Sequence, residues 1–133
     1  MEELDVIYKS NAQGELQKLS VQFARTARLF ARVLWRTNSF ERSSIDQLYR
    51  AAMSVGANVR EAQFAESPKD FVHKLKIAEK ELAEFYYWLG LLLFDLQTDT
   101  NVETELTSLS DLALRTKKLL ATIITTLKRK HGL

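Results

Sequence analysis

The pair Asp70 and His73 is a place in the sequence where residue types and spacing suggest chemistry. An acid and a histidine three positions apart share one face of a helix, and carboxylate-bridged di-iron bundles hold metal with this spacing. Such sites need two of these motifs and further inward-facing glutamates. The other histidine of the chain is His131, far along the sequence. We therefore expect no metal site, and we interpret His73 as a surface or interface residue.

The motifs of nucleophilic and phosphate-loop chemistry are missing from the sequence. There is no G-x-S-x-G motif and no Walker-type glycine loop, and no base can be assigned to Ser54 from the sequence. The chain has no cysteine, which excludes a thiolate nucleophile, a thiolate metal site and a disulfide framework. We predict a protein that is not an enzyme and needs no cofactor.

A row of positive side chains is the candidate binding feature. At 100° per residue its members lie within an arc of about 80° on a helix, opposite the apolar face of that helix. This cation row consists of Lys18, Arg25, Arg28, Arg32 and Arg36, with no acidic residue from Arg25 to Arg36. Arginine offers a planar fork of donors that suits phosphate, and at 1.5 Å per residue the row is roughly 27 Å long. It predicts binding to an RNA or DNA backbone. The alternative is a solvated face, or salt bridges to acids of neighbouring helices or subunits.

The stretch FYYWLGLLLF, from Phe85 to Phe94, is apolar on all sides of a helix. A membrane span needs roughly 20 apolar residues, so this run is too short to cross a bilayer. The apolar seam of the helix uses Phe85, Leu89 and Leu92 and leaves the remaining large side chains on other faces. These include Tyr86, Tyr87, Trp88, Leu91 and Phe94. An exposed apolar patch of this kind predicts self-association. The alternative is that neighbouring helices cover most of it.

The elements that position these residues follow from apolar residues at steps of three and four. They predict helices over about 15–37, 44–65, 68–96 and 101–130, within a single domain that spans residues 1–133. The third start is the clearest, because Ser67, Pro68 and Asp70 fit an N-cap, a first-turn proline and an N3 acid. Four amphipathic helices with short connections predict an all-α fold, an antiparallel up-down-up-down four-helix bundle.

Composition agrees with a globular helical protein of one domain. The chain has 133 residues, of which 46% are hydrophobic and 27% charged, with one proline and four glycines. The segment MEELDVIYKS lacks the basic and then apolar pattern of a secretory signal, so a cytoplasmic location is the expectation. A net charge of +2 is only mildly basic. An argument for nucleic-acid binding must therefore rest on where the charges lie.

Residues Arg50 to Leu89 carry a pattern of three motifs: RAAxSVxxNVxEA, then SxxDF, then LxIAxxE. Over these forty residues the chain resembles the bacterial four-helix bundle proteins related to the large-subunit rRNA intervening-sequence proteins. The resemblance implies an up-down bundle that assembles into a ring, commonly a pentamer, with a largely unassigned biochemical role. More distantly, the fold resembles the accessory variability protein of diversity-generating retroelements, which works with a reverse transcriptase and binds nucleic acid through a basic ring surface.

The family pattern falls on residues that we interpret as structural. Small side chains such as Ser54 permit close helix approach, and Asn58 and Glu61 are expected to tie the second helix to its neighbour. The pattern includes Arg50, Ser54, Asn58, Glu61, Ser67, Asp70 and Phe71.

Two hypotheses about function follow from these observations. The first is a non-enzymatic, ring-forming protein that binds RNA or assists a reverse transcriptase. The alternative is a structural or protein-interaction module without nucleic-acid binding, whose arginines pair within the assembly. Both imply a homo-oligomer, with a pentameric ring favoured. RNA or another protein is the further partner, and no membrane is involved.

Overall fold

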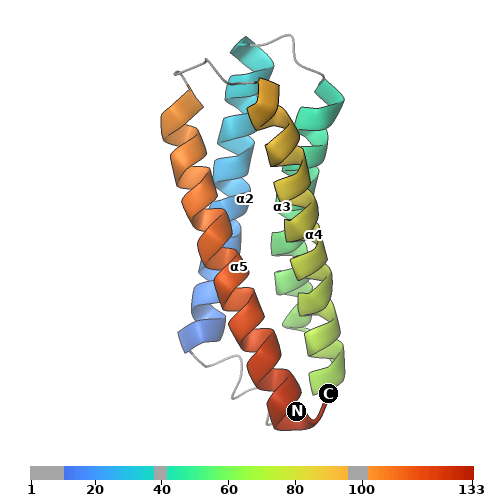
Figure 1. The fold of residues 1–133 in the computed structure, drawn as a ribbon. Coiled ribbons are helices and arrows are strands. Elements are labelled where there is room, and N and C mark those ends of the chain that lie inside the picture. Colours follow the sequence, from blue (N-terminus) through green and yellow to red (C-terminus); the bar gives the residue numbers. More distant parts are fainter. Residues whose placement is uncertain (1–10, 38–41, 96–101) are drawn as a thin grey trace.

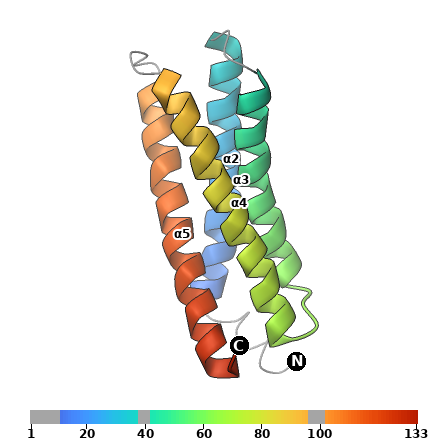
Figure 2. The same ribbon diagram turned by 45° about the vertical axis from the view of Figure 1, so that its right-hand side comes forward.

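The computed structural model describes residues 11–37, 42–95 and 102–133, and these ranges form four α-helices. Their bounds are α2 (Asn11–Thr37), α3 (Arg42–Ala62), α4 (Pro68–Asp95) and α5 (Glu103–His131). Successive helices run in opposite directions along one long axis (Figures 1 and 2). Each helix packs against two others, and the pairs are α2 with α3, α3 with α4, α4 with α5, and α2 with α5. The predicted all-α four-helix bundle is confirmed.

Contacts between side chains establish the direction of neighbouring helices independently. Near one end of the bundle, the rings of Trp35 on α2 and Tyr49 on α3 meet edge to face at 6.2 Å. Near the other end, Gln17 Nε2 donates to Gln63 Oε1, just beyond α3, at 3.1 Å. Low numbers on α2 therefore face high numbers on α3, which is the antiparallel arrangement.

The core consists of the apolar seams that the helical period predicts. On α2 every seam residue is at most 3% exposed: Leu16, Leu19, Phe23, Ala27, Phe30 and Leu34. The seam of α4 from Phe71 to Leu92 is at most 5% exposed, and Phe85 meets Phe23 of α2 edge to face at 4.7 Å. Burial of these large side chains is the main favourable term in the stability of such a bundle.

The start of α4 has the cap that the sequence predicts. The helix begins at Pro68, and the Asp70 N–H donates to Ser67 Oγ at 3.0 Å. The Asp70 carboxylate in turn accepts the N–H of Glu66 at 3.1 Å. Ser67 therefore satisfies one of the free donors at this helix end, as an N-cap serine does.

The bounds of the second helix differ from the prediction. It begins at Arg42 instead of residue 44 and ends at Ala62 instead of residue 65. After Ala62 the chain tightens, because the N–H groups of residues 63, 64 and 65 each bond to the carbonyl three positions earlier, at 3.0 to 3.1 Å. Ala65 is still buried, at 3% exposed, so the apolar period continued past the true helix end.

The other helices follow the predicted ranges with small shifts. The first begins at Asn11 instead of residue 15, and the last runs over Glu103–His131 instead of 101–130. Residues 96 and 101 lie outside the described ranges. No helix in the described part of the chain is long and apolar enough to cross a membrane.

Candidate nucleic-acid interface

The cation row lies on the outer face of α2. Its five members, Lys18, Arg25, Arg28, Arg32 and Arg36, are all exposed. Within the described ranges none of them forms an ion pair, because every ion pair found there belongs to other residues. The arginines therefore keep their guanidinium groups in solvent, where an anion can reach them.

Positive charge is concentrated on two neighbouring helices. α2 carries five cations and one acid, Glu15, and α5 carries six cations and three acids. α3 and α4 together carry seven cations and seven acids. Because α2 and α5 lie side by side, one half of the bundle is basic and the other is balanced (Figures 1 and 2).

A shallow groove of about 250 Å³ runs between α2 and α5. It is lined by Glu15, Leu19, Arg115, Lys118, Leu119 and Thr122. Lys118 is exposed, and the guanidinium of Arg115 lies 3.6 Å from the Asp111 carboxylate on its own helix. α5 thus adds two cations along the edge of the α2 face, a contribution that sequence periodicity alone did not predict.

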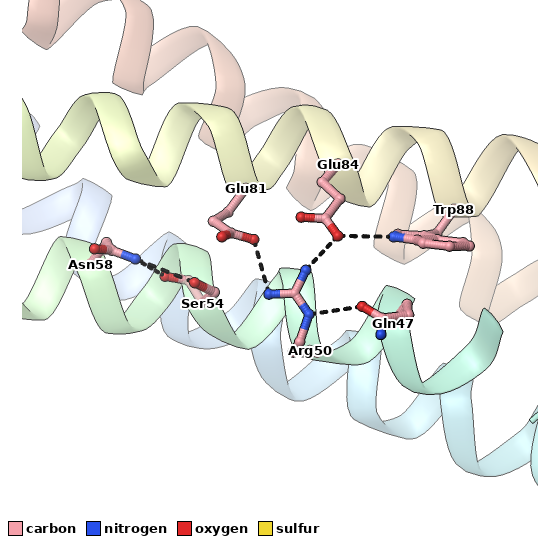
Figure 3. A network of polar contacts seen from close by, with 7 residues as sticks. All are labelled: Gln47, Arg50, Ser54, Asn58, Glu81, Glu84 and Trp88. Atoms are coloured by element: carbon pink, nitrogen blue, oxygen red, sulfur yellow. Dashed lines mark hydrogen bonds and ion pairs between the residues drawn. The ribbon is translucent and has the colours of Figure 1, made fainter. Parts of the chain in front are cut away.

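On the balanced half, Arg50 joins α3 to α4 (Figure 3). Its guanidinium donates to Glu81 Oε2 at 3.2 Å and to Glu84 Oε1, and its Nε donates to Gln47 Oε1 at 2.9 Å. Glu84 Oε1 also accepts the indole N–H of Trp88 at 3.2 Å. This network crosses the packed interface between the two helices and engages residues from both.

The Arg50–Glu84 contact alters the acid–base properties of both groups. The hydrogen bond from Arg50, followed by that from Trp88, lowers the pKa of Glu84. The hydrogen bond to Glu84 raises the pKa of Arg50. Both shifts favour the charged forms, so the pair is an ion pair throughout the neutral range.

The remaining family-pattern residues lie on or beside α3 and α4. Asn58 Nδ2 donates to the Ser54 carbonyl at 2.9 Å and to its Oγ at 3.3 Å, within α3 (Figure 3). Glu61 pairs with Lys74 of α4 at 3.2 Å, and so connects the two helices. Ser67 and Asp70 form the cap of α4, and Phe71 is fully buried. The Glu61–Lys74 pair therefore joins α3 to α4 as expected, whereas Asn58, which was also expected to tie the two helices, bonds within α3.

Fewer side chains of the aromatic stretch are exposed than the sequence predicted. Tyr87, Leu91 and Phe94 are 60%, 44% and 76% exposed, and they lie at helical spacing on one face of α4. Tyr86 and Trp88 are half-buried and pack against the core. The Lys117 ammonium lies 5.6 Å from the Tyr86 ring centroid, and burial raises the pKa of the Tyr86 hydroxyl. We refer to Tyr87, Leu91 and Phe94 as the α4 stripe.

The acid–histidine pair shows no metal-binding arrangement. The Asp70 carboxylate is engaged in the helix cap, and His73 is exposed. In the ranges that the structure describes, no group of three or more histidine, cysteine, aspartate or glutamate side chains is placed to hold a metal ion.

Phe64 is a surface residue that the sequence reasoning missed. Its side chain is 75% exposed, and the Arg60 guanidinium lies over its ring, 6.0 Å from the centroid. The sequence pattern predicted that Phe64 lies inside the second helix. An aromatic residue outside the apolar seam of a helix does not indicate that the chain turns there. Phe64 is exposed because it lies on the tight turn that follows α3.

Comparisons with known proteins agree with this architecture. The model of a family described as 23S rRNA-intervening sequence protein matches residues 15–122. A solved structure from Bacteroides thetaiotaomicron VPI-5482, described as a protein of unknown function from the S23 ribosomal protein family, is 34% identical. The match covers 82% of this chain and 97% of that one, with a TM-score of 0.71. No curated protein matches the chain.

Proposed function

The chain belongs to the 23S rRNA-intervening sequence protein family, and from that premise we propose that it binds the RNA backbone through the cation row of α2. The protein acts in this proposal as a non-enzymatic binding module. An accessory role beside a reverse transcriptase stays a prediction.

The exposed and unpaired state of the cation row is the observation that supports RNA binding. Surface arginines that serve stability are commonly found next to acids, as Arg50 is beside Glu81 and Glu84. Arg25, Arg28 and Arg32 have no such partner among the described residues. A row of free guanidinium groups roughly 27 Å long spans several phosphates of a nucleic-acid backbone.

Binding of this kind is governed by charge and by helix geometry. Phosphate contacts fix the position and orientation of the nucleic acid, but they carry no sequence information. We therefore expect affinity for many RNA sequences, with a steep dependence on salt, because each neutralised phosphate releases counterions.

We also propose that the α4 stripe mediates self-association into a ring. α2 and α4 occupy opposite corners of the bundle, because each packs against α3 and α5. Covering Tyr87, Leu91 and Phe94 therefore does not by itself cover the cation row of the same subunit. A closed ring has head-to-tail contacts, so the stripe meets a different surface of the next subunit. The family resemblance favours five subunits.

The proposed RNA binding is tested by fluorescence anisotropy with a structured RNA at low salt. The variant Arg25→Gln, Arg28→Gln, Arg32→Gln removes three charges from the cation row. The matched control Lys69→Gln, Lys80→Gln, Lys130→Gln removes three exposed charges elsewhere. We expect the parent and the control to bind and the cation-row variant to lose most of its affinity. Equal loss in both variants would show only a response to net charge, and absence of binding by the parent would refute the proposal.

A further inference from the structure

The backbone at Phe64 is hydrogen-bonded within a turn, although its ring is in solvent. Its backbone N–H donates to the Glu61 carbonyl at 3.0 Å, and the N–H groups on either side make the same kind of bond. Ala62 and Ala65, which flank this turn, are buried. The α4 cap begins two residues later, at Ser67. An aromatic ring that is 75% exposed thus lies on a hydrogen-bonded turn that is flanked by buried residues on both sides.

The Arg60 side chain lies over the Phe64 ring. Its guanidinium carbon lies 6.0 Å from the centroid of Phe64, within the range of a cation–π contact. Arg60 is exposed, and none of the ion pairs among the described residues includes it. Its donors are therefore available to a ligand that stacks on the ring.

The Phe64 turn adjoins the Lys18 end of the cation row. Gln63, beside Phe64, accepts a hydrogen bond of 3.1 Å from Gln17 of α2, which is beside Lys18. Arg60 and Val21 line one small groove of about 70 Å³ between α3 and α2. The Phe64 turn therefore lies near the Lys18 end of the cation row.

The α4 stripe lies far from Phe64 along the bundle. Leu91 lies 23 residues after the start of α4 at Pro68, which is roughly 35 Å along the helix at 1.5 Å per residue. Phe64 precedes that start. The exposed ring of Phe64 is thus separate from the α4 stripe.

We infer that Phe64 and Arg60 form a stacking site for an unpaired nucleobase at the end of the RNA segment held by the cation row. This inference rests on the proposed function. Every base has a π-face, so stacking on an aromatic ring tolerates any sequence, and an adjacent arginine adds a cation–π contact. Bases inside a duplex are already stacked, so the site takes a single-stranded extension or a splayed base. The RNA class that fits is a duplex with an unpaired end or bulge.

The experiment compares two RNAs on the full chain: a blunt duplex, and the same duplex with a short single-stranded extension that carries 2-aminopurine. The parent is measured beside Phe64→Ala and Phe64→Trp. We expect Phe64→Ala to weaken binding of the extended RNA roughly 5- to 150-fold, as loss of one stacking contact would. Its affinity for the blunt duplex should not change, and Phe64→Trp should retain the affinity of the parent. The fluorescence of 2-aminopurine should fall on binding to the parent and not on binding to Phe64→Ala.

Four results would overturn the inference. If Phe64→Ala binds both RNAs as the parent does, the ring has no part in binding, while the proposed RNA function stands. If Phe64→Ala weakens both RNAs equally, the site does not select an unpaired base. If it instead changes the mass of the assembly in light scattering, the ring contacts another copy of the chain. Failure of the parent to bind either RNA at low salt would refute the proposed function and the inference together.

Discussion

At the scale of single residues, two arginine environments separate structure from binding. Arg50 is surrounded by Gln47, Glu81 and Glu84, and joins two helices. The arginines of the cation row are exposed on one helix and have no acidic partner among the described residues. Arginine therefore joins two helices at position 50, whereas in the cation row it is available to a ligand.

Arg50→Gln should lower the free energy of unfolding by about 1 kcal/mol. The Arg50 side chain is 44% exposed, so solvent screens its ion pairs, and surface pairs contribute about 0–1 kcal/mol each. Urea unfolding monitored by circular dichroism measures the change. Lys76→Gln is the control, because its pair with Glu79 lies within one helix, and it should have a smaller effect. Equal effects of the two substitutions would contradict a role for Arg50 in joining the helices.

Glu84 should make the stability depend on pH in the acid range. Its pKa is lower in the folded protein, chiefly through the hydrogen bond from Arg50. The unfolded chain therefore binds protons first, and the stabilisation is complete above the ordinary glutamate pKa of about 4.3 and is lost as the pH falls through the lower folded value. Urea midpoints of the parent and of Glu84→Gln, compared from neutral to acid pH, should converge in acid. A constant difference would show that this carboxylate is not the source.

At the scale of elements, α4 has the best-defined beginning in the described chain. Ser67, Pro68 and Asp70 act together there, and the Ser67 hydroxyl accepts the Asp70 N–H. The helix that begins at this point carries Glu81 and Glu84 toward Arg50 and the α4 stripe to the surface. Its start therefore helps to fix the register of both features.

Ser67→Ala should lower the free energy of unfolding by about 1 kcal/mol, the typical value for an N-cap. Ser67→Asp should restore most of the loss, because aspartate also caps helices and its charge suits the helix N-terminus. Thermal and urea unfolding provide the measurement. If the alanine and aspartate variants are equally destabilised, the hydroxyl is not acting as a cap.

The sequence predicted the helices well where the apolar spacing and the capping residues agreed. The seams of α2 and α4 were buried as expected, and the start of α4 was correct because three local signals agreed. The end of α3 was placed three residues late, because Ala65 remains buried after the chain leaves the helix. The spacing of apolar residues predicts which side chains are buried. It does not predict where the helix ends, because side chains in the tight turn that follows can also be buried.

The candidate site was predictable only where it lies on one helix. Helical geometry placed the cation row opposite the buried seam of α2, and its members are exposed. Arg115 and Lys118 of α5 join that surface through the packing of two helices distant in sequence. Phe64 depends on a turn that the residue pattern did not reveal. A single sequence does not show which helices pack against each other, nor the geometry of the turns that join them.

At the scale of the whole molecule, the cation row and the α4 stripe lie on opposite corners of the bundle. α2 and its neighbour α5 carry most of the excess positive charge, and the α4 stripe lies on the helix diagonal to α2. This separation allows one face to associate with other copies while the other contacts RNA. It also makes the two surfaces testable one at a time.

Leu91→Lys should reduce the mass of the assembly, because it introduces a charge into the α4 stripe. Leu29→Lys is the matched control: Leu29 is 52% exposed on α2, and Leu91 is 44% exposed on α4. Size-exclusion chromatography with light scattering measures both. If Leu29→Lys dissociates the assembly and Leu91→Lys does not, the α2 face and not the α4 stripe is buried between subunits.

The salt dependence of RNA binding tests the central claim most directly. Anisotropy titrations at several salt concentrations give the slope of log affinity against log salt for the parent, the triple cation-row variant and the triple lysine control. Each lost phosphate contact reduces the steepness of that slope by about 0.7 to 0.9. We predict a slope shallower by about 2 to 3 for the cation-row variant and unchanged for the control. Identical slopes for all three proteins would contradict binding of phosphates by α2.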